Sequence, residues 1–163
     1  MKLYSIKKSN IDNKGRGLYA TKNIRSGTKI INYKGKIITN KQLDRSDKYD
    51  NGKPIYLFTL NKRYTLDGDF SWNIAGLVNH SCNPNSEYEG KGFKVWITAI
   101  KDIKQGDEIT CDYGFSFDKD YKQFPCNCNS INCCGYIVQE VSRWRINKKF
   151  AMSNKNQLIK NSK

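Results

Sequence analysis

Asn79-His80-Ser81-Cys82-Asn83-Pro84-Asn85 is the stretch of the chain that says most about its fold. A second polar motif, G-D-E-I-T-C-D-Y-G, runs from Gly106 to Gly114. Taken alone, an Asn-His pair before a Ser-Cys turn is ordinary loop chemistry, and Asp-Tyr-Gly after an apolar run is an ordinary strand end. The information lies in their joint occurrence, in this order and at this separation, because a short motif gains meaning only from its context.

The length and composition indicate one globular domain with small appendages. The chain has 163 residues, of which 37% are hydrophobic, and its three Trp, ten Tyr and seven Phe supply bulky core material. No apolar run is long enough for a transmembrane helix, so no membrane association is expected. The stretch from Met1 to Lys8 lacks the apolar segment of a signal peptide.

The net charge of +14, from 29 basic and 15 acidic residues, favours an anionic partner. DNA, RNA and the nucleosome surface all fit this charge. Lys and Asn are abundant throughout the chain, so a coding bias toward these residues explains the charge equally well.

Six cysteines occur at positions 82, 111, 126, 128, 133 and 134. Without a secretion signal, metal binding is favoured over disulfides. Cys126, Cys128 and Cys133 form the pattern C-x-C-x4-C. Three thiolates complete a tetrahedral Zn²⁺ site only if a fourth ligand joins them.

The hydrophobic pattern predicts short strands separated by turns, with little helix. A turn around Gly15-Arg16-Gly17 leads into a strand at Leu18. Thr39 is a candidate N-cap for a short helix that ends at Asn51-Gly52. The expected strands are residues 3–6, 18–20, a continuous one through 29–38, 56–60, 64–68, 93–100 and 108–113, and a short helix is expected over 72–78. The strand 93–100 places Phe93, Val95, Ile97 and Ala99 on one face.

Together the two motifs resemble the core motifs of SET-domain protein lysine methyltransferases. The resemblance covers residues 3 to 137, and the stretch from 106 to 137 looks most like the trithorax and nuclear-receptor-binding branches, which carry a post-SET zinc-binding segment. It implies a mainly β fold of small curled sheets with a C-terminal pseudoknot, a few short helices and a zinc-clipped post-SET flap. The implied units are a SET domain at 1–117 with a variable insert at about 39–65, a post-SET zinc segment at 118–138 and a basic C-terminal tail at 139–163.

The resemblance also implies roles for individual residues. Tyr113 is the expected catalytic residue, and Tyr33 and Tyr56 line the channel for the substrate lysine, with Cys111 beside it. The methyl donor is expected to contact Lys14, Gly15, Arg16, Tyr56, Asn79, His80 and Tyr113. His80 would act through its backbone, which is compatible with a buried structural side chain.

Two positions depart from the family pattern. Gly76-Leu77 stands where the family often has Arg-Phe, so one contact to the donor is missing or is supplied elsewhere. Cys111 stands where the family has Phe or Tyr, a residue that limits how many methyl groups the lysine receives. The smaller Cys111 allows di- or trimethylation, although a wider channel would equally slow the reaction by loosening the amine.

In post-SET proteins the cysteine of the N-H-S-C motif completes the zinc site, which makes Cys82 the expected fourth ligand beside Cys126, Cys128 and Cys133. Cys134 is interpreted as a spare thiol, with an exchange of Cys133 and Cys134 left open. The tail from Arg143 to Lys163 has seven basic and no acidic residues. It is expected to dock a helix through Val141, Trp144 and Ile146 and then to end in a basic segment that contacts nucleosomal DNA or is simply solvated.

The sequence therefore predicts an enzyme that transfers a methyl group from S-adenosyl-L-methionine to a lysine of a protein, with a histone tail as the expected substrate. The expected location is the nucleus and its chromatin, of the host if the chain comes from a virus or parasite. The oligomeric state is left open. One alternative is a catalytically weak SET-like module that binds peptide or nucleic acid. Another is a zinc-clipped nucleic-acid-binding protein with fortuitous motifs, whose affinity would fall steeply with salt.

Overall fold

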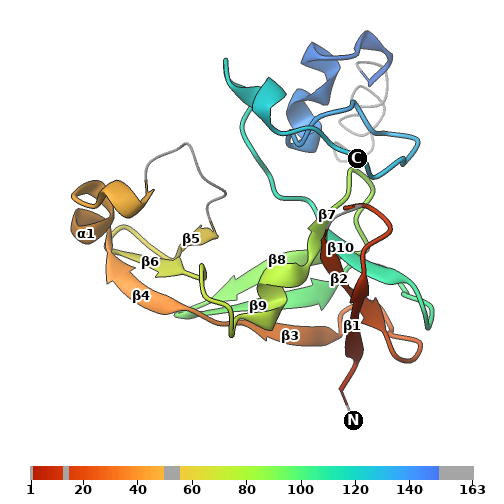
Figure 1. Cartoon of the computed structure of the whole chain (residues 1–163), viewed down its shortest axis with the longest axis horizontal. Helices are drawn as coiled ribbons and strands as arrows, with labels where there is room; N and C mark the ends of the chain where they lie inside the picture. Colours follow the sequence, from red (N-terminus) through yellow and green to blue (C-terminus); the bar gives the residue numbers. More distant parts are fainter. Residues whose placement is uncertain (1, 13–14, 50–55, 151–163) are drawn as a thin grey trace, which may run out of the picture.

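Three small β-sheets form the body of the molecule, and the segment after the last strand stands apart from them at one end (Figure 1). This computed structural model describes residues 2–12, 15–49 and 56–150. The prediction of a mainly β fold built from small sheets is confirmed. Within these described ranges, no helix is long and apolar enough to cross a membrane.

The four-stranded sheet brings the two sequence motifs together. Its order is β1 (Tyr4–Lys8), β2 (Arg16–Ala20), β10 (Glu108–Cys111) and β7 (Asn79–His80). β10 pairs antiparallel with β2 and parallel with β7, so that Cys111 lies opposite His80. The ends of both motifs are therefore adjacent, as a shared site requires. The pseudoknot stays a prediction of the resemblance.

The other two sheets have three strands each. One has the order β3 (Lys29–Tyr33), β9 (Lys94–Ala99) and β8 (Ser86–Lys91), and the other has the order β4 (Lys36–Thr39), β6 (Tyr64–Asp67) and β5 (Leu57–Thr59). The prediction of one continuous strand through residues 29–38 is wrong, because the chain leaves one sheet after β3 and enters another at β4. A β-carbon on Gly35, at this change of sheet, would collide with the backbone carbonyl of Asp67.

The predicted helix start at Thr39 is confirmed, but the predicted helix end is wrong. The Thr39 hydroxyl accepts a hydrogen bond from the Gln42 N–H, and the Gln42 side chain accepts one from the Thr39 N–H, which is a capping box. Helix α1 spans Asn40–Asp44 only, and a separate 3₁₀ turn, η1, spans Asp47–Tyr49. The buried Asp67 carboxylate accepts hydrogen bonds from Lys48 Nζ and the Tyr49 hydroxyl, which fixes η1 against β6. The expected end at Asn51-Gly52 lies outside the described residues.

The core lies between the sheets. Val95, Ile97 and Ala99 of β9 are buried, as the alternation predicts, but the prediction is wrong for Phe93, which is 51% exposed. Phe93 precedes β9 and packs edge-on against the ring of Tyr64 instead. The buried apolar cluster comprises Leu18, Ala20, Ile24, Ile30, Tyr33, Leu66, Ala75, Val78, Val95, Ile97, Ala99, Ile103, Ile109 and Cys111.

The remaining short elements are 3₁₀ turns: η2 (Ile74–Leu77), η3 (Tyr121–Gln123), η4 (Glu140–Arg145) and η5 (Lys148–Phe150). η2 confirms the short helix expected before the Asn79-His80 pair. The expectation that the tail docks through Val141 and Trp144 is wrong, because these side chains are 65% and 43% exposed. The side chain of η4 that enters the molecule is Arg143, which is only 2% exposed because backbone carbonyls and a carboxylate satisfy its guanidinium.

Candidate functional site

His80 is a buried, neutral residue that holds the two motifs in register. Its Nδ1 accepts a hydrogen bond from the Tyr113 N–H at 3.1 Å, and its Nε2 lies 3.5 Å from Cys82 Sγ. Since Nδ1 is an acceptor, the proton sits on Nε2. Burial lowers the pKa of His80 to about 4, an effect that Asp112 opposes. The side chain thus fixes the backbone at Tyr113, in keeping with the structural role expected for it.

Asn79 belongs to a hydrogen-bond network centred on Glu108, a residue that the sequence analysis missed. Asn79 Nδ2 lies within hydrogen-bond distance of Ser9 Oγ, the Arg16 carbonyl and Glu108 Oε1, at 3.0, 3.1 and 2.8 Å. The Glu108 carboxylate also accepts hydrogen bonds from Ser9 Oγ, the Asn10 N–H and the Tyr19 hydroxyl. The Asn79 amide nitrogen therefore fastens the G-R-G turn to β10.

The glycines of the G-R-G turn make this close packing sterically feasible. A β-carbon on Gly17 would collide with the Glu108 carboxylate, and one on Gly15 would collide with the Asp12 side chain. The turn is closed by a hydrogen bond from the Gly15 N–H to the Asp12 carbonyl. Lys14, expected to contact the methyl donor, lies outside the described residues. The Arg16 side chain is exposed at the start of β2.

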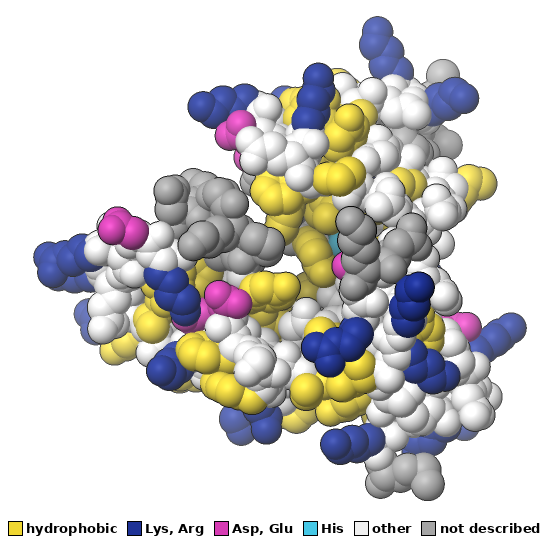
Figure 2. All heavy atoms as spheres, viewed as in Figure 1, with side chains coloured by type: hydrophobic (Ala, Val, Ile, Leu, Met, Phe, Trp, Pro, Cys, Tyr) yellow, Lys and Arg dark blue, Asp and Glu magenta, His cyan; other side chains and the backbone are white. Residues whose placement is uncertain are grey.

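The tyrosines expected to form the lysine channel do come together. Tyr33, Tyr56 and Tyr113 line one cavity of about 280 Å³. Figure 2 shows a hollow in this face of the molecule in which hydrophobic side chains gather, with Lys and Arg side chains around its outer parts. The full lining is Tyr33, Tyr56, Leu57, Phe58, Gly76, Val78, Tyr88, Tyr113, Phe115, Phe124 and Ile137.

Two of these phenols are oriented by backbone carbonyls. The Tyr113 hydroxyl donates to the Val78 carbonyl at 2.9 Å, and the Tyr33 hydroxyl donates to the Tyr56 carbonyl at a longer 3.5 Å. Burial, together with the neighbouring tyrosines, raises the pKa of both Tyr113 and Tyr33 above the ordinary value. Both side chains are therefore neutral hydroxyls at physiological pH.

Tyr88 is a further cavity residue that the sequence analysis missed. It projects from β8 and packs against Phe58 and Tyr33, with ring centroids 4.6 and 6.1 Å apart. Within the described part of the chain its hydroxyl makes no hydrogen bond to protein. Burial raises its pKa, and so does the proximity of the Cys111 thiol. No sequence motif marks this position. Tyr88 was missed because it lies between two glutamates on a strand of mostly polar residues.

Cys111 is not one of the residues that line this cavity. The side chain is fully buried, and its thiol lies 3.2 Å from Ser86 Oγ. Burial raises the pKa of the Cys111 thiol to about 12. The Cys111 thiol lies near enough to the Tyr88 hydroxyl to raise the pKa of Tyr88, so a small residue at position 111 has a large one at position 88 nearby.

A second cavity, of about 250 Å³, is lined by Asn79 and His80 of the first motif and shares Tyr113 with the first cavity. Its lining comprises Ile11, Asp12, Asn79, His80, Tyr113, Pro125, Cys126, Asn127 and Ile137. Polar side chains and an aromatic ring meet here with apolar walls, which suits a nucleoside-like ligand. Tyr113 and Ile137 line both cavities, so the two spaces meet at the predicted catalytic residue.

A third, more polar cavity of about 250 Å³ lies beside Gly76, one of the positions at which the sequence departs from the expected pattern. Arg16 is the one basic residue among the described residues that line it. Tyr56 and Gly76 line both this cavity and the tyrosine-lined one. Arg16 of the G-R-G turn thus provides a cation in the same cavity as Gly76.

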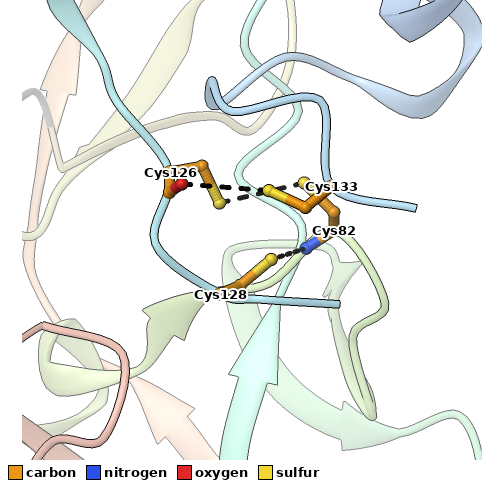
Figure 3. Close-up of side chains that lie close together, drawn as sticks. All are labelled: Cys82, Cys126, Cys128 and Cys133. Atoms are coloured by element: carbon orange, nitrogen blue, oxygen red, sulfur yellow. Dashed lines mark hydrogen bonds between the residues drawn. The ribbon is translucent and has the colours of Figure 1, made fainter. Parts of the chain in front are cut away.

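The four cysteines predicted to bind metal converge on one point (Figure 3). The Sγ atoms of Cys82, Cys126, Cys128 and Cys133 all lie within 4.8 Å of one another, and the Cys82 and Cys126 sulfurs are 3.8 Å apart. Tetrahedral zinc with Zn–S bonds of about 2.3 Å requires sulfurs about 3.8 Å apart. Cys134 points elsewhere, with its thiol donating to the Tyr136 carbonyl. The cluster could therefore hold a metal ion, with Cys133 and not Cys134 as the ligand.

The environment of Cys128 favours a thiolate, whereas that of Cys82 and Cys133 favours the thiol. Cys128 Sγ accepts a hydrogen bond from the Cys82 N–H and lies 3.1 Å from Ser130 Oγ, and Cys133 Sγ accepts a hydrogen bond from the Gly135 N–H. Although burial opposes ionisation, these bonds lower the pKa of Cys128 to about 6. The hydrogen bond with Cys126, with burial, raises the pKa of Cys82, and burial raises that of Cys133 to about 11. A divalent metal would replace these protons, because metal ligation requires the thiolate.

Comparison with known proteins agrees with this arrangement. The family model described as "SET domain" matches residues 15–114, which is more than half of the chain. The chain is 36% identical over 125 residues to human "Histone-lysine N-methyltransferase 2D" and 36% identical over 129 residues to Drosophila virilis "Histone-lysine N-methyltransferase trithorax". These alignments cover 73% and 76% of the chain but only 2% and 3% of the relatives. A third relative, Schizosaccharomyces pombe "Histone-lysine N-methyltransferase, H3 lysine-4 specific", is 36% identical over 129 residues, which is 74% of the chain and 14% of the relative.

The family model spans both the G-R-G turn and the D-Y-G motif. Arg16 of the turn lines the third cavity, and Tyr113 of the D-Y-G motif lines the other two. This chain belongs to the SET-domain family.

Proposed function

We propose that this chain is an S-adenosyl-L-methionine-dependent protein lysine methyltransferase that modifies a histone tail. The observation that carries the proposal is that two cavities meet at Tyr113: one lined by tyrosines, the other by Asn79 and His80. A lysine side chain and a nucleoside-like donor can then approach the same residue from two sides. Methyl transfer is an in-line displacement at carbon, so the proposal requires the amine and the methyl group to be aligned where the two cavities share Tyr113.

The tyrosine-lined cavity suits a lysine side chain at both stages of the reaction. Its π-faces tolerate the ammonium group as it enters. Its apolar walls disfavour the charged form and so lower the pKa of the amine, which must lose its proton before it can act as a nucleophile. The neutral Tyr113 hydroxyl, held by the Val78 carbonyl, is available to orient that amine.

The second and third cavities are the proposed donor site. S-adenosyl-L-methionine supplies an activated methyl group when it is bound. The residues proposed to hold it are Lys14, Gly15, Arg16, Tyr56, Asn79, His80 and Tyr113. Asn79 presents its side-chain carbonyl, since its nitrogen is occupied by protein acceptors, and Arg16 supplies the cation that Gly76 does not.

The proposed product state is di- or trimethyllysine. Cys111 has no ring and does not line the tyrosine-lined cavity, whereas Tyr88 does. The Tyr88 hydroxyl has no hydrogen-bond partner within the described residues. Control of the methylation degree therefore rests on Tyr88 more than on Cys111.

The proposed architecture is a SET unit at 1–117, a variable insert at about 39–65, a post-SET segment at 118–138 and a basic tail at 139–163. Zn²⁺ bound by Cys82, Cys126, Cys128 and Cys133 would attach the post-SET segment to the N-H-S-C motif. Because Phe124 and Ile137 line the lysine cavity, this attachment also completes the cavity wall.

The relatives are named as histone-lysine methyltransferases, and the S. pombe relative is named for lysine 4 of H3, which makes histone H3 the first substrate to test. The net charge of +14 supports a contact between the basic tail and nucleosomal DNA. A chromatin substrate places the protein in a nucleus, of the host if the chain is of viral or parasite origin.

Mass spectrometry of nucleosomes and of histone H3 peptides incubated with the protein and donor tests the proposal. Methyl addition that is lost in Tyr113→Phe would support the enzyme and identify the modified lysine. Donor binding without methylation of any histone would point to a different protein substrate, and absence of donor binding would favour the peptide- or nucleic-acid-binding alternative.

A further inference from the structure

One arginine from the segment after the cysteine cluster is buried against residues of both sequence motifs, Cys82 and Asp112. Arg143 lies in η4 (Glu140–Arg145) and is 2% exposed, whereas the side chain of Trp144 is 43% exposed. An arginine is seldom buried unless its donors are satisfied, because burying an unpaired charge is costly.

The guanidinium of Arg143 is satisfied by three separate segments. Its Nε donates to the Val138 carbonyl at 3.0 Å, and its Nη1 donates to the Cys82 carbonyl at 2.7 Å. Its Nη2 donates to Asp112 Oδ2 at 2.6 Å, a short, charge-assisted contact. Only a planar, multidentate cation serves acceptors in these three directions, which a lysine ammonium at the same place does not do.

Two of these partners adjoin functional residues. Asp112 immediately precedes Tyr113, and its other oxygen, Oδ1, accepts the Gly114 N–H at 2.9 Å. Cys82 is both a member of the cysteine cluster and the neighbour of His80, whose Nδ1 accepts the Tyr113 N–H. Arg143 therefore holds the turn that carries Tyr113 and the metal-binding loop in one fixed arrangement.

We propose that Arg143 is a positioning residue for catalysis, and that the catalytic unit extends through η4 rather than ending with the cysteine cluster at about residue 138. The proposal rests on the proposed methyltransferase function. It assigns to Arg143 the task of fixing the backbone at Tyr113, so that the tyrosine hydroxyl and the cavity walls keep their places when substrate binds.

The test compares Arg143→Gln and Arg143→Lys with Arg145→Gln. Arg145 is the matched control, because it is an arginine of the same 3₁₀ turn but its side chain is exposed. Hydrogen exchange of the Tyr113 and Gly114 amides is measured first, against amides of the central strand β9. Arg143→Gln is expected to speed exchange at these two amides at least tenfold with β9 unchanged, and Arg143→Lys to have a smaller effect. Arg145→Gln is expected to leave both unchanged.

Steady-state kinetics supply the second readout. Arg143→Gln is expected to lower kcat at least tenfold, with KM for an H3 peptide and the zinc content per chain within threefold of the wild type. In an Asp112→Asn background the same substitution should have a much smaller effect, because the two side chains act as a pair.

Unchanged exchange at Tyr113 and Gly114 would overturn the proposal. Faster exchange with unaltered kcat would overturn it too, since it would show that Arg143 has a purely structural role. If the wild-type protein methylates no histone, the kinetic measurement contradicts the proposed function. The exchange data still decide whether Arg143 fixes the turn that carries Tyr113.

Discussion

Replacing Tyr88 by Phe should shift the products toward higher methylation without destabilising the fold. The Tyr88 hydroxyl makes no hydrogen bond within the described residues, so its removal breaks none, and the unfolding free energy should change by less than about 0.5 kcal/mol. In the complex, this hydroxyl is free to accept an N–H from the substrate amine. A neutral lysine amine has two N–H bonds, its monomethyl form has one and its dimethyl form has none, so the hydroxyl favours the less methylated substrates.

The size of the effect follows from the value of one hydrogen bond. A net contribution of about 1 kcal/mol corresponds to a rate factor of about fivefold. Tyr88→Phe should therefore raise the rate of the third methylation about fivefold relative to the first. A time course of mono-, di- and trimethylated H3 peptide by mass spectrometry measures this ratio.

Tyr64→Phe is the matched control, because Tyr64 packs against Phe93 and does not line the cavity. An active Tyr88→Phe protein with the wild-type product ratio would refute the reasoning. So would a shift toward monomethyllysine. Either result would return control of the product state to Cys111 or to the cavity as a whole.

Three further predictions concern the metal, the G-R-G turn and the donor. Cys134→Ser should retain one zinc per chain by elemental analysis and Cys133→Ser should lose it; the reverse result would show that the cluster uses Cys134. Gly17→Ala should destabilise the fold by about 1–3 kcal/mol in chemical denaturation because its β-carbon meets the Glu108 carboxylate, whereas Gly90→Ala, with open space around it, should have no such effect. Arg16→Gln should weaken binding of S-adenosyl-L-methionine about tenfold by calorimetry if its guanidinium pairs with the donor carboxylate, and equal affinity would remove Arg16 from the donor site.

The sequence predicted the parts of the site that depend on spacing along the chain. The N-H-S-C and D-Y-G motifs, the tyrosines at 33 and 56 and the four-cysteine cluster are brought together as expected. The Thr39 helix cap was also predictable, because a capping box involves residues only three positions apart.

The residues that were missed are those whose roles depend on distant partners. Glu108 looks like an ordinary polar residue in its motif, and only folding brings four hydrogen-bond donors to it. Arg143 looks like one charge of a basic tail, and nothing local distinguishes it from Arg145. Tyr88 is separated from Cys111 along the chain, so the exchange of a large and a small residue is visible only in three dimensions. Phe93 was misplaced because alternation alone does not show where a strand stops.

Glu108 and Arg143, the two charged residues that were missed, suggest why the site forms cooperatively. Glu108 fastens the G-R-G turn to β10, and Arg143 fastens the C-terminal segment to the turn after β10. Each charge is favourable only when its partners are all present, because a half-satisfied buried network is worse than an apolar one. A chain that lacks either contact thus loses more than one hydrogen bond, since the remaining partners in that network are left unpaired. Polar networks therefore lie at both ends of β10, through Glu108 at its start and Asp112 just after its end, and the apolar core supports the sheets on which these networks are built.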